Sequence, residues 1–241
     1  MSKIESKTVT YGAAGTTLRG HLETPAEANG AGVLVFHEWW GLNDYIRGRA
    51  RMLAELGYTA LAADMYGDGR VAANAEEANG LMSGVVGDVA AGEARIDAAI
   101  ELLAGQPGVD AKRIGAIGYC FGGAMVLHAA RTGRPLAGVV SFHGALGSFH
   151  KPAPGSVVAK ILVCHGGDDA LVPAEDVANF KAEMDAAQAD YQFTVYPGAM
   201  HGFSNPDATA KGKEFGLPLA YNADVDKQTW EAMQAFFAAV L

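Results

Sequence analysis

The chain has 241 residues, half of them hydrophobic, and its 18 basic and 27 acidic side chains give a formal net charge of −9. The apolar half excludes an intrinsically disordered chain, and the longest apolar runs are too short to cross a bilayer. The negative charge argues against a polyanionic partner such as nucleic acid. The composition therefore predicts a globular protein that binds neither nucleic acid nor a membrane.

The cysteine content and the N-terminus predict the compartment. Two cysteines, Cys120 and Cys164, are too few for a disulfide framework. Residues 1–7 lack the apolar stretch of a signal peptide. Both features favour a cytoplasmic protein. No stretch of the sequence resembles a linker or an internal repeat, so we expect one domain over residues 1–241.

Taken in chain order, the sequence first predicts two short strands, at residues 7–11 and 16–22, that form a hairpin rich in Thr, Val and Tyr. Beyond the hairpin, short apolar runs alternate with segments of helical period. The expected strands are 32–36, 58–63, 114–118, 137–142, 160–164 and 191–196. The expected helices are 45–56, 89–103, 123–131, 174–187 and 226–240.

This alternation predicts the fold class. Continuous apolar runs are typical of strands buried on both faces, and their alternation with helices indicates parallel pairing. The expected class is α/β, with a mostly parallel sheet covered by helices on both faces. Functional residues of such sheets lie at the carboxyl ends of the strands. The polar or reactive residues that come just after expected strands are Glu38, Asp64, Cys120, His143, Asp169 and His201.

One motif gives the strongest indication of chemistry: Gly118-Tyr119-Cys120-Phe121-Gly122-Gly123, between an expected strand and an expected helix. A nucleophile flanked by small residues on a sharp strand-to-helix turn is typical of hydrolases, many of which have Ser in place of Cys120. The helix N-terminus favours a thiolate, and the amide of Phe121 points at a developing oxyanion. Cys120 is thus predicted to be a nucleophile, whereas Cys164, inside an apolar run, is predicted to be a core residue.

Such a nucleophile needs a base and an orienting acid, in the chain order nucleophile, acid, histidine. Asp169 follows an expected strand, and His201 lies in a glycine-flanked loop after the next one. Asp168 is the alternative acid. His143 precedes the acid, which favours a structural or pocket-lining role for it. No CxxC, HxH or HExxH spacing is present, so no metal is expected.

The loop after the first central strand reads His37-Glu38-Trp39-Trp40-Gly41. In hydrolases with this kind of turn, that loop supplies a second oxyanion donor, here the backbone amide of Trp39. Glu38 would bring a carboxylate near Cys120, where a negative charge would keep the thiol protonated and oppose the helix dipole. The alternative is that Glu38 is an exposed loop carboxylate without a function.

Five stretches together resemble the dienelactone hydrolase family, a branch of the α/β-hydrolase superfamily. They are residues 37–43, 62–67, 118–123, 169–173 and 201–203. The cysteine motif with Glu38 upstream is the most specific part, and the resemblance extends over nearly the whole chain. It implies the α/β-hydrolase fold and hydrolysis of a small-molecule lactone or carboxylic ester without a cofactor. The oligomeric state, monomer or homodimer, stays open.

The resemblance also implies roles for individual residues. The implied triad is Cys120, Asp169 and His201, with Asp169 favoured over Asp168 because it precedes x-x-Val-Pro. The nucleophile forms a thioester, and the histidine activates the water that cleaves it. Glu38 is implied to hold or release the thiol proton as substrate binds. The backbone amides implied to form the oxyanion hole are those of Trp39 and Phe121. The side chains expected to line the substrate pocket are Trp40, Tyr119, His143 and Phe203.

One departure from the family bears on the substrate. Members that open a dienelactone anchor its carboxylate with arginines, one of them a few residues after the catalytic histidine. Here residues 203–207 contain no Arg, and residues 71–89 contain neither Arg nor Lys. Without a guanidinium fork, an anionic substrate loses its bidentate partner. A neutral ester, lactone or acyl compound is therefore at least as good a candidate as dienelactone itself.

Two other classes of function remain open from the sequence. The chain could be a catalytically silent protein that binds a small molecule in the same pocket. It could instead be a thiol redox sensor, which requires an exposed reactive Cys120 and usually a resolving cysteine. The expected burial of Cys164 argues against the sensor.

Overall fold

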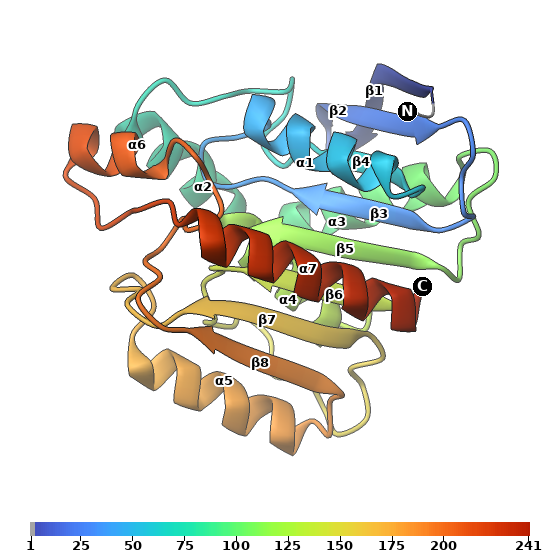
Figure 1. The fold of residues 1–241 in the computed structure, drawn as a ribbon. Helices are drawn as coiled ribbons and strands as arrows, with labels where there is room; N and C mark the ends of the chain where they lie inside the picture. Colours follow the sequence, from blue (N-terminus) through green and yellow to red (C-terminus); the bar gives the residue numbers. More distant parts are fainter. Residues whose placement is uncertain (1–2) are drawn as a thin grey trace.

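Eight strands form one sheet within residues 3–241, the part of the chain that this computed structural model describes (Figure 1). Their order across the sheet is β1-β2-β4-β3-β5-β6-β7-β8. They are β1 (Ile4–Ala13), β2 (Thr16–Pro25), β3 (Gly32–Phe36), β4 (Thr59–Ala63), β5 (Ile114–Tyr119), β6 (Gly138–Phe142), β7 (Lys160–Gly166) and β8 (Tyr191–Tyr196). Strands β3 to β8 run parallel, so the predicted α/β class with a mostly parallel sheet is confirmed.

The burial of the central strands explains why their positions could be predicted from the sequence. Strands β3, β4, β5 and β6 are buried along their whole lengths, which produces continuous apolar runs. The N-terminal hairpin is longer than predicted, because β1 and β2 pair antiparallel from Ile4↔Pro25 to Ala13↔Thr16. The residues added to β1 include Glu5, Ser6 and Gly12, which are exposed and carry no apolar signal.

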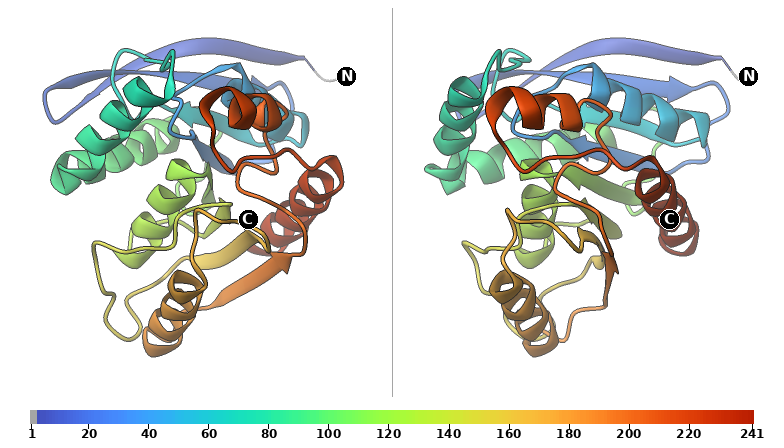
Figure 2. Two further views of the ribbon diagram at one scale, coloured as in Figure 1. Left: turned by 90° about the vertical axis from the view of Figure 1, so that its left-hand side faces the viewer. Right: turned by 60° about the vertical axis from the view of Figure 1, so that its left-hand side comes forward.

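Helices cover both faces of the sheet, as expected (Figure 2). Those of the described residues are α1 (Asp44–Glu55), α2 (Ala75–Val86), α3 (Val89–Ala104), α4 (Phe121–Arg131), α5 (Ala174–Ala186), α6 (Ala208–Phe215) and α7 (Ala223–Val240). One face packs against α1 and α7, and the other against α3, α4 and α5. No helix within residues 3–241 is both long and apolar enough to cross a membrane.

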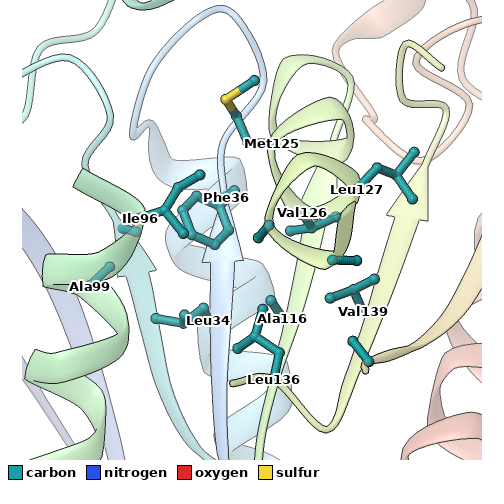
Figure 3. Packing of buried hydrophobic residues seen from close by; sticks show 14 of the residues in the cluster. Leu34, Phe36, Ile96, Ala99, Ala116, Met125, Val126, Leu127, Leu136 and Val139 are labelled. Atoms are coloured by element: carbon teal, nitrogen blue, oxygen red, sulfur yellow. The ribbon is translucent and has the colours of Figure 1, made fainter. Parts of the chain in front are cut away.

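The core beneath α3 and α4 supports the carboxyl edge of the sheet. In Figure 3, Leu34 and Phe36 of β3 lie between Ile96 of α3 and Val126 of α4, and all four side chains are fully buried. Phe36 is the last residue of β3, and β5 beside it leads directly to Cys120. The loops at this edge therefore start from fixed positions.

Two helices, α2 and α6, were not predicted. Helix α2 buries only two residues, Ala78 and Val85. Helix α6 has eight residues, two of which are lysines and one an internal glycine. Neither segment has the apolar period that identifies a helix packed on a core. Both lie beyond the carboxyl ends of the strands, on the left of Figure 1.

Candidate active site

Cys120 lies at the sharp turn between β5 and α4, as the motif predicts. Its backbone has φ 52° and ψ −113°, outside the regions that residues with a side chain normally occupy. Such a conformation costs about 1–3 kcal/mol and persists only where the surroundings enforce it. The side chain is partly exposed, in contrast to the buried Cys164. The turn thus presents one thiol to solvent at the edge of the sheet.

Close backbone packing enforces this turn. A Cβ atom at Gly118 would overlap the carbonyl group of Gly122, and one at Gly122 would overlap the carbonyl group of Phe36. A Cβ at Gly123 would lie 2.7 Å from Cα of Gly144. Only glycine permits these approaches, so part of the glycine excess in the composition serves this turn.

His201 and Asp169 meet at the same edge. Nδ1 of His201 and Oδ2 of Asp169 are 2.9 Å apart, and both residues are buried. Asp168, the alternative acid, is exposed. Among residues 3–241, Nε2 of His201 has no hydrogen-bond partner. The ring is therefore oriented by Asp169 on one side and is free to exchange a proton on the other.

The charge state of His201 depends on Cys120. Burial disfavours the imidazolium form, but the negative charge of a Cys120 thiolate and the bond to Asp169 outweigh it and raise the pKa of His201 to about 10. Within the described residues, no hydrogen bond of normal geometry joins the thiol to Nε2 of His201. Burial alone would favour neutral imidazole, and the neighbouring negative charge reverses this preference.

Glu38 is buried rather than exposed. Its Oε2 accepts a 2.6 Å hydrogen bond from Nδ2 of Asn205, in the loop that follows His201. Burial raises the pKa of the Glu38 carboxyl, and the bond from Asn205 and the positive charge of Lys211 only partly offset this effect. Burial thus disfavours the ionised form of this carboxyl group, which lies beside the loop that carries His201.

The amides expected to hold an oxyanion are available. Within the described residues, the backbone amides of Trp39 and Phe121 donate no hydrogen bond. The phenol of Tyr66 donates a 2.9 Å bond to the carbonyl of Trp39 and stacks on the ring of Phe121. Tyr66 was not among the predicted site residues. Its contacts tie the two segments that carry the amides.

The residues expected to line the pocket lie in two places. Trp40 packs edge-on against Trp39 at 5.0 Å between ring centroids and is buried in a small cluster with Ala72 and Ala78. The side chains of Tyr119, His143 and Phe203 are fully buried in the layer behind His201. There they contact one another and the His201 ring rather than solvent. Tyr119 belongs to the core because its side chain faces α1 and α7, on the opposite side of β5 from Ala116.

Asp64, which also follows a strand, has a structural role in the turn after β4. Its two carboxylate oxygens accept backbone bonds from Arg19, Tyr66, Gly67 and Gly69. This set of bonds closes the turn after β4, so the carboxylate is fully occupied. Within residues 3–241, no group of three or more His, Cys, Asp or Glu side chains is arranged to hold a metal ion.

Sequence reasoning missed three further polar residues near the site. Asn205 binds Glu38, which is 167 positions away in the chain. Ser204 contacts Tyr45 and His143 through its hydroxyl group. Nζ of Lys211, on α6, lies 4.4 Å from the centroid of the Trp40 ring. No local pattern marks these residues, because each acquires its partner only through the fold.

Together the fold and the site define the class. A strained cysteine turn between a central parallel strand and a helix, followed by an acid and a histidine after later strands, is the arrangement of an α/β-hydrolase. The sequence profile of the dienelactone hydrolase family matches residues 18–241. The chain therefore belongs to the dienelactone hydrolase family, and it is a hydrolase.

Similar proteins agree with this assignment. A crystal structure of a dienelactone hydrolase-like promiscuous phosphotriesterase, P91, from metagenomic libraries is 37% identical, with a TM-score of 0.89 and 98% of each chain covered. A structure titled m3DLH is 40% identical, with a TM-score of 0.91 and 99% of each chain covered. The "Putative carboxymethylenebutenolidase" of Escherichia coli is 30% identical over 85% of this chain and 75% of its own length.

Proposed function

We propose that the chain hydrolyses a carboxylic ester or lactone, with Cys120 as nucleophile, His201 as acid and base, and Asp169 as the group that orients His201. The observation that carries the proposal is the His201 ring. Its Nδ1 is bound by Asp169, its Nε2 is free within the described residues, and a Cys120 charge raises its pKa to about 10.

The first half of the reaction forms a thioester. The Sγ thiolate of Cys120 attacks the carbonyl carbon, and the amides of Trp39 and Phe121 stabilise the negative charge on the carbonyl oxygen. The C–O bond to the leaving group then breaks. The alkoxide takes the proton from Nε2 of His201, which leaves neutral imidazole and an acyl group on sulfur.

The second half restores the enzyme. Neutral His201 removes a proton from water, and the resulting hydroxide attacks the thioester carbon in the same oxyanion site. The C–S bond breaks, the carboxylic acid product leaves, and the thiolate–imidazolium pair forms again. Asp169 stabilises the imidazolium in both halves but does not itself take up the proton.

Glu38 is proposed to control the proton balance of this pair. Its charge affects His201, and burial holds its pKa above the ordinary value. When Glu38 is ionised, its charge favours the imidazolium form of His201. Asn205 holds the carboxyl group on the side of the catalytic loop, so a substrate that displaces this bond would also change the charge next to His201.

Lys211 bears on the substrate class. Its ammonium group lies over Trp40, and its positive charge acts on the buried Glu38. Although the arginines of dienelactone-opening members are missing, one cation therefore stands beside the site. A lysine is a point charge without the bidentate fork of arginine. We infer that neutral esters and lactones are accepted, and that a negative charge near Trp40 is tolerated rather than required.

The test compares the two cysteines. Cys120→Ala should abolish turnover of short-chain p-nitrophenyl esters and of a lactone panel, because no acyl-enzyme can form. Cys164→Ala is the matched control, since this thiol is buried and burial raises its pKa to about 12. A stalled reaction of the wild type should show one acyl group on Cys120 by mass spectrometry. Full activity in Cys120→Ala would refute Cys120 as the nucleophile and would require another one, whereas no turnover by the wild type would leave a binding protein.

The likeness to P91 gives a second candidate substrate, a neutral phosphate triester. P91 is described as a promiscuous phosphotriesterase, and it shares 37% identity with this chain. Attack of the Cys120 thiolate on phosphorus would break the P–O bond to the phenolate, which takes the proton of His201, and water activated by neutral His201 would then cleave the S–P bond and restore the thiolate. Diethyl p-nitrophenyl phosphate tests this with the same optical readout. Release of p-nitrophenol that disappears in Cys120→Ala would support the second activity, and no release above the uncatalysed rate would exclude it.

A further inference from the structure

A buried group of polar side chains lies directly behind His201 and takes no part in the mechanism above. Its centre is Ser204, whose side chain is fully buried. The hydroxyl oxygen of Ser204 lies 2.8 Å from the phenol oxygen of Tyr45 and 2.8 Å from Nε2 of His143. The backbone carbonyl of Ser204 accepts a 2.7 Å bond from Nη2 of Arg49. Both polar ends of one loop residue are thus bound by other elements.

Arg49 is itself fixed on several sides. The same nitrogen that binds Ser204 also donates a 2.5 Å bond to Asp226 of α7, and the Arg49 side chain is 6% exposed. Its guanidinium carbon lies 5.2 Å from the ring centroid of Tyr45 and 5.2 Å from that of Trp230. Arg49 therefore joins α1, α7 and the catalytic loop through charge-assisted bonds and ring contacts.

Ser204 is connected to the catalytic groups in two ways. Along the chain it is next to Asn205, the partner of Glu38, and three residues after His201. Across space its hydroxyl group binds His143, whose ring packs edge-on against the His201 ring at 5.2 Å between centroids. Burial lowers the pKa of His143, which keeps that ring neutral. A neutral ring can support the His201 imidazolium without repelling it.

We propose that Ser204 is a positioning residue, anchored by Arg49, that sets the place of His201 relative to Cys120 and of Asn205 relative to Glu38. The inference rests on the proposed function only for its kinetic readout. Bonds on the other side of the loop come from the backbone, where the amides of Ala220 and Asn222 bind the carbonyls of His201 and Phe203. Without Ser204 and Arg49, the loop would keep these backbone bonds and the bonds of His201 to Asp169 and of Asn205 to Glu38, but it would lose its support behind the His201 ring.

The first test uses Ser204→Ala and measures alkylation of Cys120 by iodoacetamide as a function of pH, with mass spectrometry to identify the modified cysteine. This readout needs no substrate, so it stays informative if the proposed function fails. Because a misplacement of about 1 Å can cost up to about 100-fold in rate, we expect alkylation at pH 7 to slow about tenfold. For the ester reaction we expect kcat to fall about tenfold or more, with KM within about twofold. Tyr45→Phe, which keeps the bond to His143, should have a smaller effect on both.

The second test pairs Arg49→Lys with Arg131→Lys, in case Ser204→Ala does not fold. Arg131 is equally buried, and it binds the carbonyl of Leu146, the carboxylate of Glu183 and the ring of Phe180, but no catalytic loop. Both variants should lower the melting temperature, and only Arg49→Lys should slow Cys120 alkylation. Wild-type alkylation and kcat in both Ser204→Ala and Arg49→Lys would overturn the proposal. An equal loss in Arg131→Lys would also overturn it, because the effect would then be general loosening of the fold.

Discussion

The turn that carries Cys120 and the loop that carries His201 meet at one edge of the sheet but are held by different contacts. The cysteine turn is fixed by backbone packed on backbone, at Gly118 and Gly122. The histidine loop is fixed largely by side-chain hydrogen bonds, through Ser204 and Asn205. Backbone packing has no room to adjust, whereas hydrogen bonds can be weakened one at a time.

This difference predicts two kinds of mutational response. A change in the cysteine turn should affect folding first, because the turn is continuous with the buried strand β5. A change in the histidine loop should affect the rate first and stability second. The strain at Cys120 is stored where the fold is rigid, and the proton transfers proposed for His201 would take place in a loop where small movements matter.

The largest expected effect is that of Gly122→Ala. The new Cβ would overlap the carbonyl of Phe36 in the central strand β3, which cannot move without disrupting the sheet. We expect a loss of about 3 kcal/mol or more in the free energy of unfolding, at the upper end of overpacking effects. Urea unfolding measures it. Gly84→Ala on α2 is the control, because nothing lies near its Cβ and a helical Ala stabilises by about 1 kcal/mol. Equal stability of the two variants would contradict the comparison.

Next comes Asp169→Asn, which leaves the shape of the acid intact but removes its charge. His201 loses the partner that favours its imidazolium form, so its pKa falls from about 10. We expect kcat/KM to fall on the order of 10³-fold, with the basic limb of the pH profile moved to lower pH. Asp168→Asn is the matched control, since Asp168 is exposed. A larger loss in the control would assign the acid to Asp168.

The sequence predicted the cysteine turn far better than the histidine loop, and the cause is physical. Cys120, Asp169 and His201 each follow a strand of the parallel part of the sheet, so the rule that strand ends converge was enough to group them. The loop contacts depend on partners distant in the chain, such as Tyr45 and Ser204, which are 159 positions apart. No spacing in the sequence encodes such a contact.

The elements of the fold divide in the same way, into those with a local apolar pattern, which were predicted, and those defined by tertiary contacts, which were not. The buried strands were placed to within about two residues, because burial on both faces leaves an uninterrupted apolar run. The start of α7 was placed at residue 226, whereas the helix begins at Ala223 with Asn222 as its N-cap. Helix α6 was missed because its contact with the site is made by Phe215 and Lys211 over Trp40, a tertiary contact without a helical apolar period.

A smaller effect is expected from Glu38→Gln, which keeps an oxygen acceptor for Asn205. Without the Glu38 charge, the imidazolium of His201 is less favoured, so the basic limb of the pH–rate profile should move down by about half a unit to one unit. An unchanged profile would remove Glu38 from the proton balance.

The pH dependence of stability tests the raised pKa of Glu38 without any substrate. Burial raises the pKa of Glu38 in the folded protein. The contribution of its protonated form to the free energy of unfolding is therefore fully present below the ordinary pKa of 4.5, and it is lost as the pH rises through the raised pKa. Gln has no such dependence. The melting temperature of Glu38→Gln relative to the wild type should therefore increase with pH over this range. A constant difference would show that the carboxyl group titrates normally.

The smallest effect is expected from a substitution of Lys211, which lies on α6 over Trp40. Lys211→Met keeps an apolar contact with Trp40 but removes the ammonium group 4.4 Å from its ring. An esterase substrate with a carboxylate near Trp40 should lose about fivefold in kcat/KM, in line with a partly exposed ion pair of up to about 1 kcal/mol. A neutral ester of the same size should change less than twofold. Lys213→Met, exposed on the same helix, controls for net charge. If both substrates lose equally in Lys211→Met, the lysine supports the packing of α6 on Trp40, and the substrate charge is selected elsewhere.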